Sequence, residues 1–272
     1  MPDPSFILPL LLQSAVIPFG VALVAALALR KTMLAAPVAI AFGFIASYFS
    51  VYLAQWSFPP QQALDWLPWL TLLIVPGATM AGTAAFPRLA LSLATAAIVA
   101  WPALPGGGLQ MMLATTAVAG VLMFLAWACL ARTSQIGPTA MLLLTVVAGG
   151  AGMAMMMDAS LLLGQLTGAL ALTFAACASL ALGRLRIPFS GAATGVAVLL
   201  LGALLTYAWI YAGFSLGYVI LLATGVLADP VMHAINRFRR SESWMPAVVL
   251  SAIPVLVTVG LVAKAAQDSG GY

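Results

Sequence analysis

Residues 139–182 read TAMLLLTVVAGGAGMAMMMDASLLLGQLTGALALTFAACASLAL, two long apolar stretches separated only by a short turn at Asp158. Each stretch is close to the about 20 residues that an α-helix needs to cross the hydrocarbon core of a bilayer. Water is absent from that core, so every backbone polar group must be paired within a helix or a closed barrel. Both stretches are continuous and lack the alternation of barrel strands. They therefore predict a pair of transmembrane helices.

Five similar stretches precede this pair and three follow it. The sequence thus predicts an all-α fold, a polytopic helical membrane bundle with about ten transmembrane helices in one domain covering residues 1–272. The run LPGGG at residues 104–108 is expected to be a flexible turn. The predicted spans are Ser5–Leu29, Met33–Ala54, Leu67–Phe86, Leu89–Trp101, Leu109–Ala131, Thr139–Met157, Leu161–Leu182, Gly191–Tyr211, Ser215–Leu227 and Met245–Ala263.

The composition indicates the same class. Hydrophobic residues make up 64% of the 272 residues, charged residues make up 6%, and the mean hydropathy is +1.14. A soluble domain carries about 25% charged residues. Ten spans use most of the chain, so no additional soluble domain is expected. Cys129 and Cys177 lie inside apolar stretches and indicate neither a disulfide framework nor a metal site.

The basic residues predict an orientation. All but Lys264 lie at alternate connections between the spans, namely Arg30, Lys31, Arg88, Arg132, Arg184, Arg186, Arg237, Arg239 and Arg240. Short cytoplasmic loops carry an excess of Lys and Arg. The pattern therefore predicts that these connections are cytoplasmic, that both termini lie outside, and that the membrane is a bacterial inner membrane. The net charge of +4 is dispersed in this way and does not indicate nucleic-acid binding.

Residues 229–243, DPVMHAINRFRRSES, predict a short amphipathic helix on the inner surface of the membrane. Asp229 suits the N-cap of this helix. The spacing of Asp229 and His233 also permits a proton relay along one helix face, although capping is the simpler interpretation. The residues expected to contact anionic lipid headgroups, the predicted partners at this surface, are Arg237, Arg239 and Arg240.

Prolines and polar residues within the spans outline a hypothetical substrate or ion path. Transporters use broken helices at their binding sites, and the sequences around Pro18 and Pro76 favour such breaks. Each hydroxyl or amide has an alternative role, because it also bonds to the backbone of its own helix. The candidates for the path are Gln13, Pro18, Pro76, Thr79, Asp158, Gln165, Asp229 and His233.

Small residues predict close helix contacts in the second half of the chain. Gly164 with Gly168, and Gly191 with Gly195, have the small-xxx-small spacing that lets two helix backbones approach. Ten spans also permit a five-plus-five inverted repeat, an arrangement used by many carriers. The sequence likeness between the two halves is too faint to establish it.

Catalysis is not expected. Hydrolytic, phosphoryl-transfer and metal enzymes need sets of carboxylate, His or Cys side chains, and no such set can be assembled here. We therefore expect no enzyme, no cofactor and no metal. One metal question stays open, since the methionines at 153–157 and at 111–112 are expected at the same membrane face and thioethers bind copper(I).

Two classes of function remain. The first is a small permease or carrier for a neutral or weakly charged solute, which the span count and the prolines favour by analogy. The second is a non-catalytic membrane subunit that packs against partner proteins or against a second copy of the chain. The glycine-rich helix faces and the shortage of buried charge favour this alternative.

Overall fold

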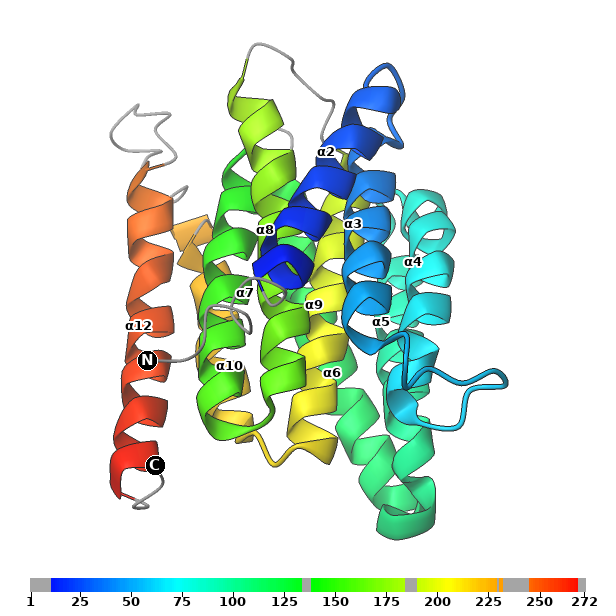
Figure 1. Ribbon diagram of the computed structural model, residues 1–272, viewed down its shortest axis with the longest axis vertical. Coiled ribbons are helices and arrows are strands. Elements are labelled where there is room, and N and C mark those ends of the chain that lie inside the picture. Colours follow the sequence, from blue (N-terminus) through cyan, green and yellow to red (C-terminus); the bar gives the residue numbers. More distant parts are fainter. Residues whose placement is uncertain (1–10, 134–137, 184–189, 229, 232–244, 269–272) are drawn as a thin grey trace.

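The computed structural model describes residues 11–133, 138–183, 190–228, 230–231 and 245–268. These residues form helices and turns, and none of them belongs to a strand. Consecutive helices run antiparallel in one bundle (Figure 1). The turn with Arg30 and Lys31 lies at one end of the bundle, called the arginine end below. The connection at residues 53–62 lies at the opposite end, called the loop end.

The helices follow the predicted spans in order. In the first half they are the π-helical turn η1 (Leu12–Val16), α2 (Ile17–Ala28), α3 (Ala35–Tyr52), the 3-10 helix η2 (Ala63–Trp66), α4 (Leu67–Ala81), α5 (Ala85–Ala100), the 3-10 helix η3 (Trp101–Ala103) and α6 (Leu104–Thr133). In the second half they are α7 (Thr139–Asp158), α8 (Leu161–Leu182), α9 (Gly191–Tyr211), α10 (Leu216–Val226) and α12 (Met245–Asp268).

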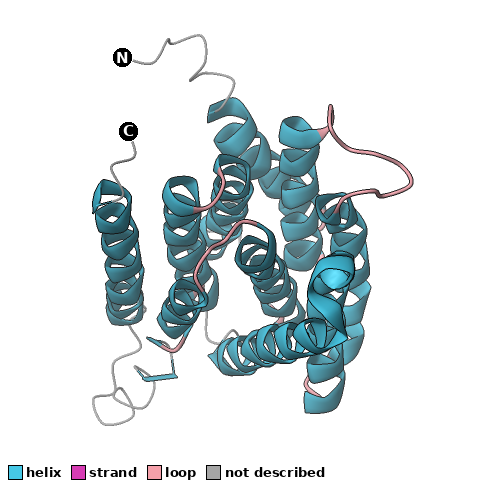
Figure 2. Cartoon of the chain, turned by 90° about the horizontal axis from the view of Figure 1, so that it is seen from below, coloured by secondary structure: helices cyan, strands magenta, loops and turns pink. Residues whose placement is uncertain are grey.

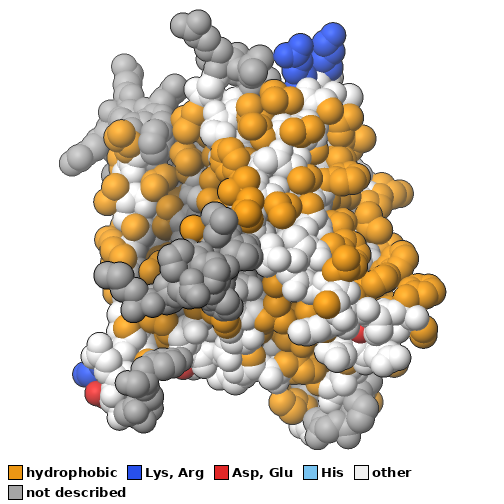
Figure 3. Space-filling view, in the orientation of Figure 1, with side chains coloured by type: hydrophobic (Ala, Val, Ile, Leu, Met, Phe, Trp, Pro, Cys, Tyr) orange, Lys and Arg blue, Asp and Glu red, His pale blue; other side chains and the backbone are white. Residues whose placement is uncertain are grey.

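Among the described residues, eight helices are long and apolar enough to cross a membrane. The other two apolar helices are shorter, Leu12–Ala28 and Leu216–Val226. With its 11 residues, α10 is about 16 Å long, roughly half of the hydrocarbon thickness. Hydrophobic side chains cover the face seen in Figure 3, and its coloured charges lie at the two ends. The chain is an integral membrane protein built as a helical bundle.

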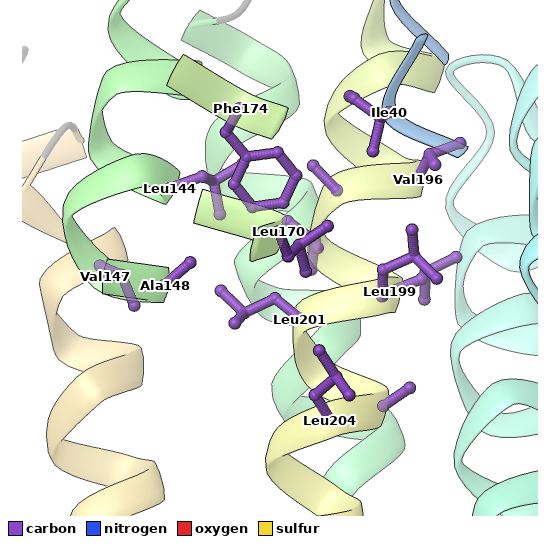
Figure 4. Close-up of a cluster of buried hydrophobic side chains, with 14 of the residues drawn as sticks. Ile40, Leu144, Val147, Ala148, Leu170, Phe174, Val196, Leu199, Leu201 and Leu204 are labelled. Carbon is purple, nitrogen blue, oxygen red and sulfur yellow. The ribbon is translucent and has the colours of Figure 1, made fainter. Parts of the chain in front are cut away.

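Helix α9 occupies the centre of the bundle. It contacts α3, α4, α5, α6, α7 and α8, and most of its residues are buried. Figure 4 shows part of this core: Phe174 of α8 and Leu144 of α7 lie next to each other on one side of α9, and Val196 and Leu199 of α9 lie on its other side. The tight filling of the centre with leucine, valine, alanine and phenylalanine leaves α9 no polar face.

Helix α12 lies at the edge of the bundle, opposite the edge from which the 53–62 connection projects (Figure 1, Figure 2). It packs on α7 and α10 only through one stripe, whose buried residues are Ala247, Ser251, Val255, Thr258 and Val262. Its other faces expose apolar side chains such as Val249 and Leu256. Lipid accounts for such an apolar surface in a membrane protein.

The structure corrects three local predictions. The run at residues 104–108 is not wholly a turn, because its first residues are helical; at Gly108 the backbone is non-helical, with φ +72°, and the spanning helix Gly108–Ala131 begins there, next to the predicted start at Leu109. The fourth span is longer than predicted, since α5 already begins at Ala85. The helix is not broken at Pro18 or at Pro76: the π-helical turn precedes Pro18, and α4 continues through Pro76.

Other predictions are not tested. The surface helix proposed for residues 229–243 lies almost entirely outside the described residues, as do both chain ends. In each half of the chain the first helix packs on the second and the fourth packs on the fifth. That likeness is compatible with the five-plus-five arrangement, and the inverted repeat stays a prediction.

Candidate functional site

An apolar groove lies between α6, α7, α9 and α10 and is the candidate site. It is narrow and partly open to the surroundings: its cavity volume is about 50 Å³, and about 590 Å³ when the open space at its mouth is included. Its lining residues are Ala119, Leu122, Met123 and Ala126 of α6, Leu144 and Val147 of α7, Val198, Leu201, Gly202, Leu205, Thr206 and Trp209 of α9, and Leu216, Val219, Ala223 and Val226 of α10.

The groove exists because α10 stays apart from α9, its neighbour in the chain. Helix α10 packs mainly on α12 and α7 and barely contacts α9. Its lining residues recur at intervals of three or four, so they form one stripe on the helix. On the opposite wall, Leu201, Leu205 and Trp209 of α9 have the same helical spacing. Two apolar stripes therefore face each other across open space.

The wall formed by α6 and α9 is, by contrast, tightly closed. A Cβ added at Gly195 would lie 2.3 Å from the ring of Trp127, and a Cβ added at Gly202 would lie 2.5 Å from Cγ of Met123. The two glycines are seven residues apart and receive two large side chains of α6. The indole Nε1–H of Trp127 also donates to the carbonyl oxygen of Gly191, at 3.0 Å. This contact confirms the prediction that Gly195 permits close packing.

Thr206 is the one lining residue with a hydroxyl, and Trp209 adds an indole N–H group. The Thr206 hydroxyl donates to the carbonyl oxygen of Gly202 in its own helix, at 2.7 Å. The groove therefore offers a ligand mainly apolar contacts, with the indole N–H of Trp209 as a side-chain donor. Such a site selects molecules by their apolar part.

The predicted path residues do not form one polar site. Pro76 is exposed on α4, and Thr79 donates to the carbonyl oxygen of Pro76 at 2.7 Å, within its own helix. Helix α4 packs on α3, α5 and α9 and lies away from η1 and α8, which carry Gln13 and Gln165. Pro18 is buried and Asp158 is exposed at the end of α7. None of these residues lines the groove.

Gln13 contributes through its backbone. Its carbonyl oxygen accepts a hydrogen bond from the Ser47 hydroxyl at 3.3 Å, so the amide side chain is not the group that joins η1 to α3. Gln165 is half-buried on α8. The remaining path candidates, Asp229 and His233, lie outside the described residues. The arginines expected to contact lipid headgroups, Arg237, Arg239 and Arg240, also lie outside them.

Two methionines of α7 pack against α8. Met155 is buried and accepts a hydrogen bond from the Thr167 hydroxyl of α8 at 3.4 Å. Met156 lies against Gly164 of α8. Met111 and Met112 of α6 line a separate small pocket with η3. These contacts are packing contacts, and a copper(I) site stays an untested prediction.

Two buried charges were not expected from the sequence. The first is Asp65 of η2, which is fully buried at the loop end. Its Oδ2 accepts hydrogen bonds from the Ser57 hydroxyl at 2.8 Å and from the backbone N–H groups of Gln61 and Gln62 at 3.0 and 2.9 Å. These bonds belong to a capping box between Gln62 and Asp65. The Q-x-x-D spacing was the signal available in the sequence.

The second buried charge is Arg88 of α5, near the arginine end, with 8% of its surface exposed. Its guanidinium donates from Nε to the carbonyl oxygen of Gly82 at 3.0 Å and lies over the ring of Trp127, 5.2 Å from the centroid. The positive-inside pattern suggested a solvent-facing arginine at this position. The nearby Trp127 and Gly82 give it a buried place instead.

Comparison with known proteins does not assign the chain to a family. No family model matches it, and neither a curated protein nor a solved structure matches it significantly. The described residues also contain no group of three His, Cys, Asp or Glu side chains placed to hold a metal ion. The functional argument therefore rests on the geometry of the groove.

Proposed function

We propose that the protein is a small membrane carrier for an uncharged amphipathic molecule, held by its apolar part in the groove between α6, α7, α9 and α10. The observation that carries this proposal is the groove itself, an opening lined by apolar side chains in an otherwise closely packed bundle. Pockets for small molecules are lined mainly by apolar groups.

The lining supports this substrate class. A charged group placed in the groove would lose its hydration and find no charged partner among the lining residues, which costs several kcal/mol. An apolar chain that moves from lipid into such a groove exchanges one set of apolar contacts for another, so it has no desolvation cost. The polar part of the substrate is expected near one end of the helices, at the membrane interface. In this proposal the arginine end faces the cytoplasm.

The proposal assigns the protein no catalytic step. The groove lining offers no nucleophile, no general acid or base, and no metal-binding side chain beyond the thioether of Met123. Binding and release of the substrate are the events that the lining supports.

A subunit role is the second candidate, and the position of α12 favours it. This helix is attached through one stripe, and the rest of its surface is apolar and exposed. A partner helix would cover this surface as well as lipid does. The two candidates differ in purification: a carrier is active alone, whereas a subunit keeps its partner in stoichiometric amount in mild detergent.

Transbilayer movement of a fluorescent amphiphile tests the carrier proposal. The purified protein is placed in phosphatidylcholine vesicles that contain a trace of phosphatidylcholine with an NBD-labelled acyl chain, a zwitterion without net charge. Dithionite, added outside, destroys the dye of the outer leaflet. We expect the protein to bring inner-leaflet dye outward, so that the fluorescence continues to fall after the fast phase. A plateau equal to that of protein-free vesicles overturns the proposal.

A further inference from the structure

Arg88 is a buried cation without a counter-charge. Only 8% of the surface of the whole residue is exposed, and no described residue forms an ion pair with it. Burial of a charge is costly unless the charge is paired and hydrogen-bonded.

The guanidinium has spare donors. Nε and Nη2 both donate to the carbonyl oxygen of Gly82. Arginine has five N–H groups, and the others donate to no described residue. Nη1 has no partner among the described residues, and it keeps some accessible surface. The donors that remain are therefore available to a ligand.

The start of α9 adds a second source of positive potential at the same place. A Cβ added at Gly191, the first residue of α9, would lie 3.4 Å from Nη2 of Arg88. The backbone N–H groups of Gly191 and Ala192 donate to no described residue, whereas those of Ala193 and Thr194 donate to Ser190. A helix N-terminus carries about half a positive charge. The Arg88 guanidinium and the N-terminus of α9 are thus two neighbouring positive centres, and each has N–H groups that donate to no described residue.

We propose that Arg88 and the N-terminus of α9 bind a phosphate group at the arginine end of the bundle. An anion there offsets the repulsion between the two positive centres and accepts their free N–H groups. Trp127 holds the guanidinium from the other side through its ring and is itself fixed by its bond to Gly191. The phosphate comes from a lipid headgroup or from a soluble anion. This site lies apart from the groove, and its test does not depend on transport.

Thermal unfolding of the intact protein in nonionic detergent tests the site. Tryptophan fluorescence follows unfolding while sodium phosphate is added at constant ionic strength, with chloride as the reference. In parallel, phosphatidylglycerol is added, with phosphatidylcholine as the reference. A ligand that binds only the folded state raises the midpoint as its concentration increases. Stabilisation by phosphatidylglycerol alone identifies a lipid headgroup, and stabilisation by inorganic phosphate identifies a soluble anion. The proposal is overturned if neither anion stabilises the protein more than its reference does.

Variants locate the effect. Arg88→Gln is expected to raise the apparent Kd for the anion about tenfold or more, because the charge-assisted hydrogen bonds are lost. Arg30→Gln removes the same charge from an exposed position at the same end and is expected to leave the Kd unchanged. Equal Kd values for these two variants would overturn the proposal.

A substitution on α9 covers the case in which Arg88→Gln does not fold. Gly191→Pro removes one of the free N–H donors, and proline is well accepted at the first position of a helix. Ser190 already has the extended backbone that a following proline requires, with φ −105° and ψ 158°. We expect this variant to bind the anion several-fold more weakly than the parent protein. Unchanged binding in Gly191→Pro contradicts the proposed site.

Discussion

Two pairs of consecutive helices in this bundle behave in opposite ways. Helices α7 and α8 pack backbone to backbone: a Cβ added at Gly152 would lie 3.0 Å from the carbonyl oxygen of Gly164 and from the amide nitrogen of Gly168. Helices α9 and α10 are also joined by a short turn, yet they barely touch, and the groove lies between them. Proximity in sequence therefore does not decide which helices pack.

The residues on the facing surfaces explain this difference. In a bilayer, apolar side chains gain little by leaving lipid, so helices associate through close van der Waals contact between small residues. The α7–α8 contact has glycines on both sides. The facing stripes of α9 and α10 carry Leu201, Leu205 and Trp209 opposite Leu216 and Val219. On α9 the small residues Gly195 and Gly202 face α6 instead.

The largest effect is expected where the tight pair is forced apart. In Gly164→Leu the new Cβ would lie 2.2 Å from Cγ of Met156 and 2.7 Å from the carbonyl oxygen of Gly152, which is backbone and cannot move aside. We expect a loss of about 3 kcal/mol or more in the free energy of unfolding. Gly149→Leu is the matched control, because no atom lies within 4 Å of its Cβ position. Thermal or denaturant unfolding in mild detergent measures both, and equal stabilities would contradict the α7–α8 contact.

A smaller loss is expected at the closed wall of the groove. Gly195→Ala places a methyl group 2.3 Å from the rigid ring of Trp127 and should push α6 away from α9, at a cost of about 2 kcal/mol. The same substitution at Gly20, where no atom lies within 4 Å of the Cβ position, is expected to be nearly neutral. The unfolding midpoints of these two alanine variants compare them directly. A Gly195→Ala protein as stable as Gly20→Ala would show that α6 and α9 are not in contact.

Filling the open pair should change binding far more than stability. Ala223→Phe adds a ring to the groove and is expected to alter the free energy of unfolding by less than about 1 kcal/mol, because it displaces no packed side chain. Quenching of Trp209 by phosphatidylcholine brominated at mid-chain reports occupancy, with Trp209→Phe identifying the Trp209 contribution. Ala114→Phe, exposed on α6, serves as the control. We expect weaker quenching in Ala223→Phe only, and quenching that persists there would mean that the groove is not occupied.

The smallest effect is expected at the one lining residue with a hydroxyl group. Thr206→Val removes a hydroxyl whose bond stays within α9, so we expect a change below about 1 kcal/mol in stability and no change in the quenching of Trp209. A clear fall in quenching would reveal that the hydroxyl turns toward the ligand. The substrate class would then include molecules with a hydrogen-bonding group.

Much of the fold could be predicted from the sequence, because a bilayer permits so few solutions. Long apolar runs give helices, and their limits were placed within a few residues for most of the chain. Gly164 and Gly168 also correctly predicted a close helix contact in the second half of the chain, and the structure shows that its partner is α7. Prolines were misleading: Pro76 lies in an unbroken helix, with its ring exposed on the outer face of α4.

The groove and the buried charges were not predictable in the same way. They depend on which helices neighbour each other in space, and the apolar sequences of α6, α9 and α10 give no sign of that. Arg88 is an example. Its position among the basic residues indicated a surface loop, whereas its burial depends on Trp127 and on Gly191, which come from two distant helices. The polar path expected from Gln13 to Asp158 was drawn from residue type alone, and those residues do not line the groove.

The most direct measurement compares transport in the two phenylalanine variants. Ala223→Phe and Ala114→Phe are reconstituted at equal density in vesicles that contain NBD-labelled phosphatidylcholine, and the slow fall in fluorescence after dithionite gives the rate of transbilayer movement. If the groove between α9 and α10 carries the substrate, the rate in Ala223→Phe falls about tenfold or more, because a filled pocket excludes the apolar chain, while Ala114→Phe keeps the parent rate. Equal rates in the two variants would contradict the assignment of transport to the groove.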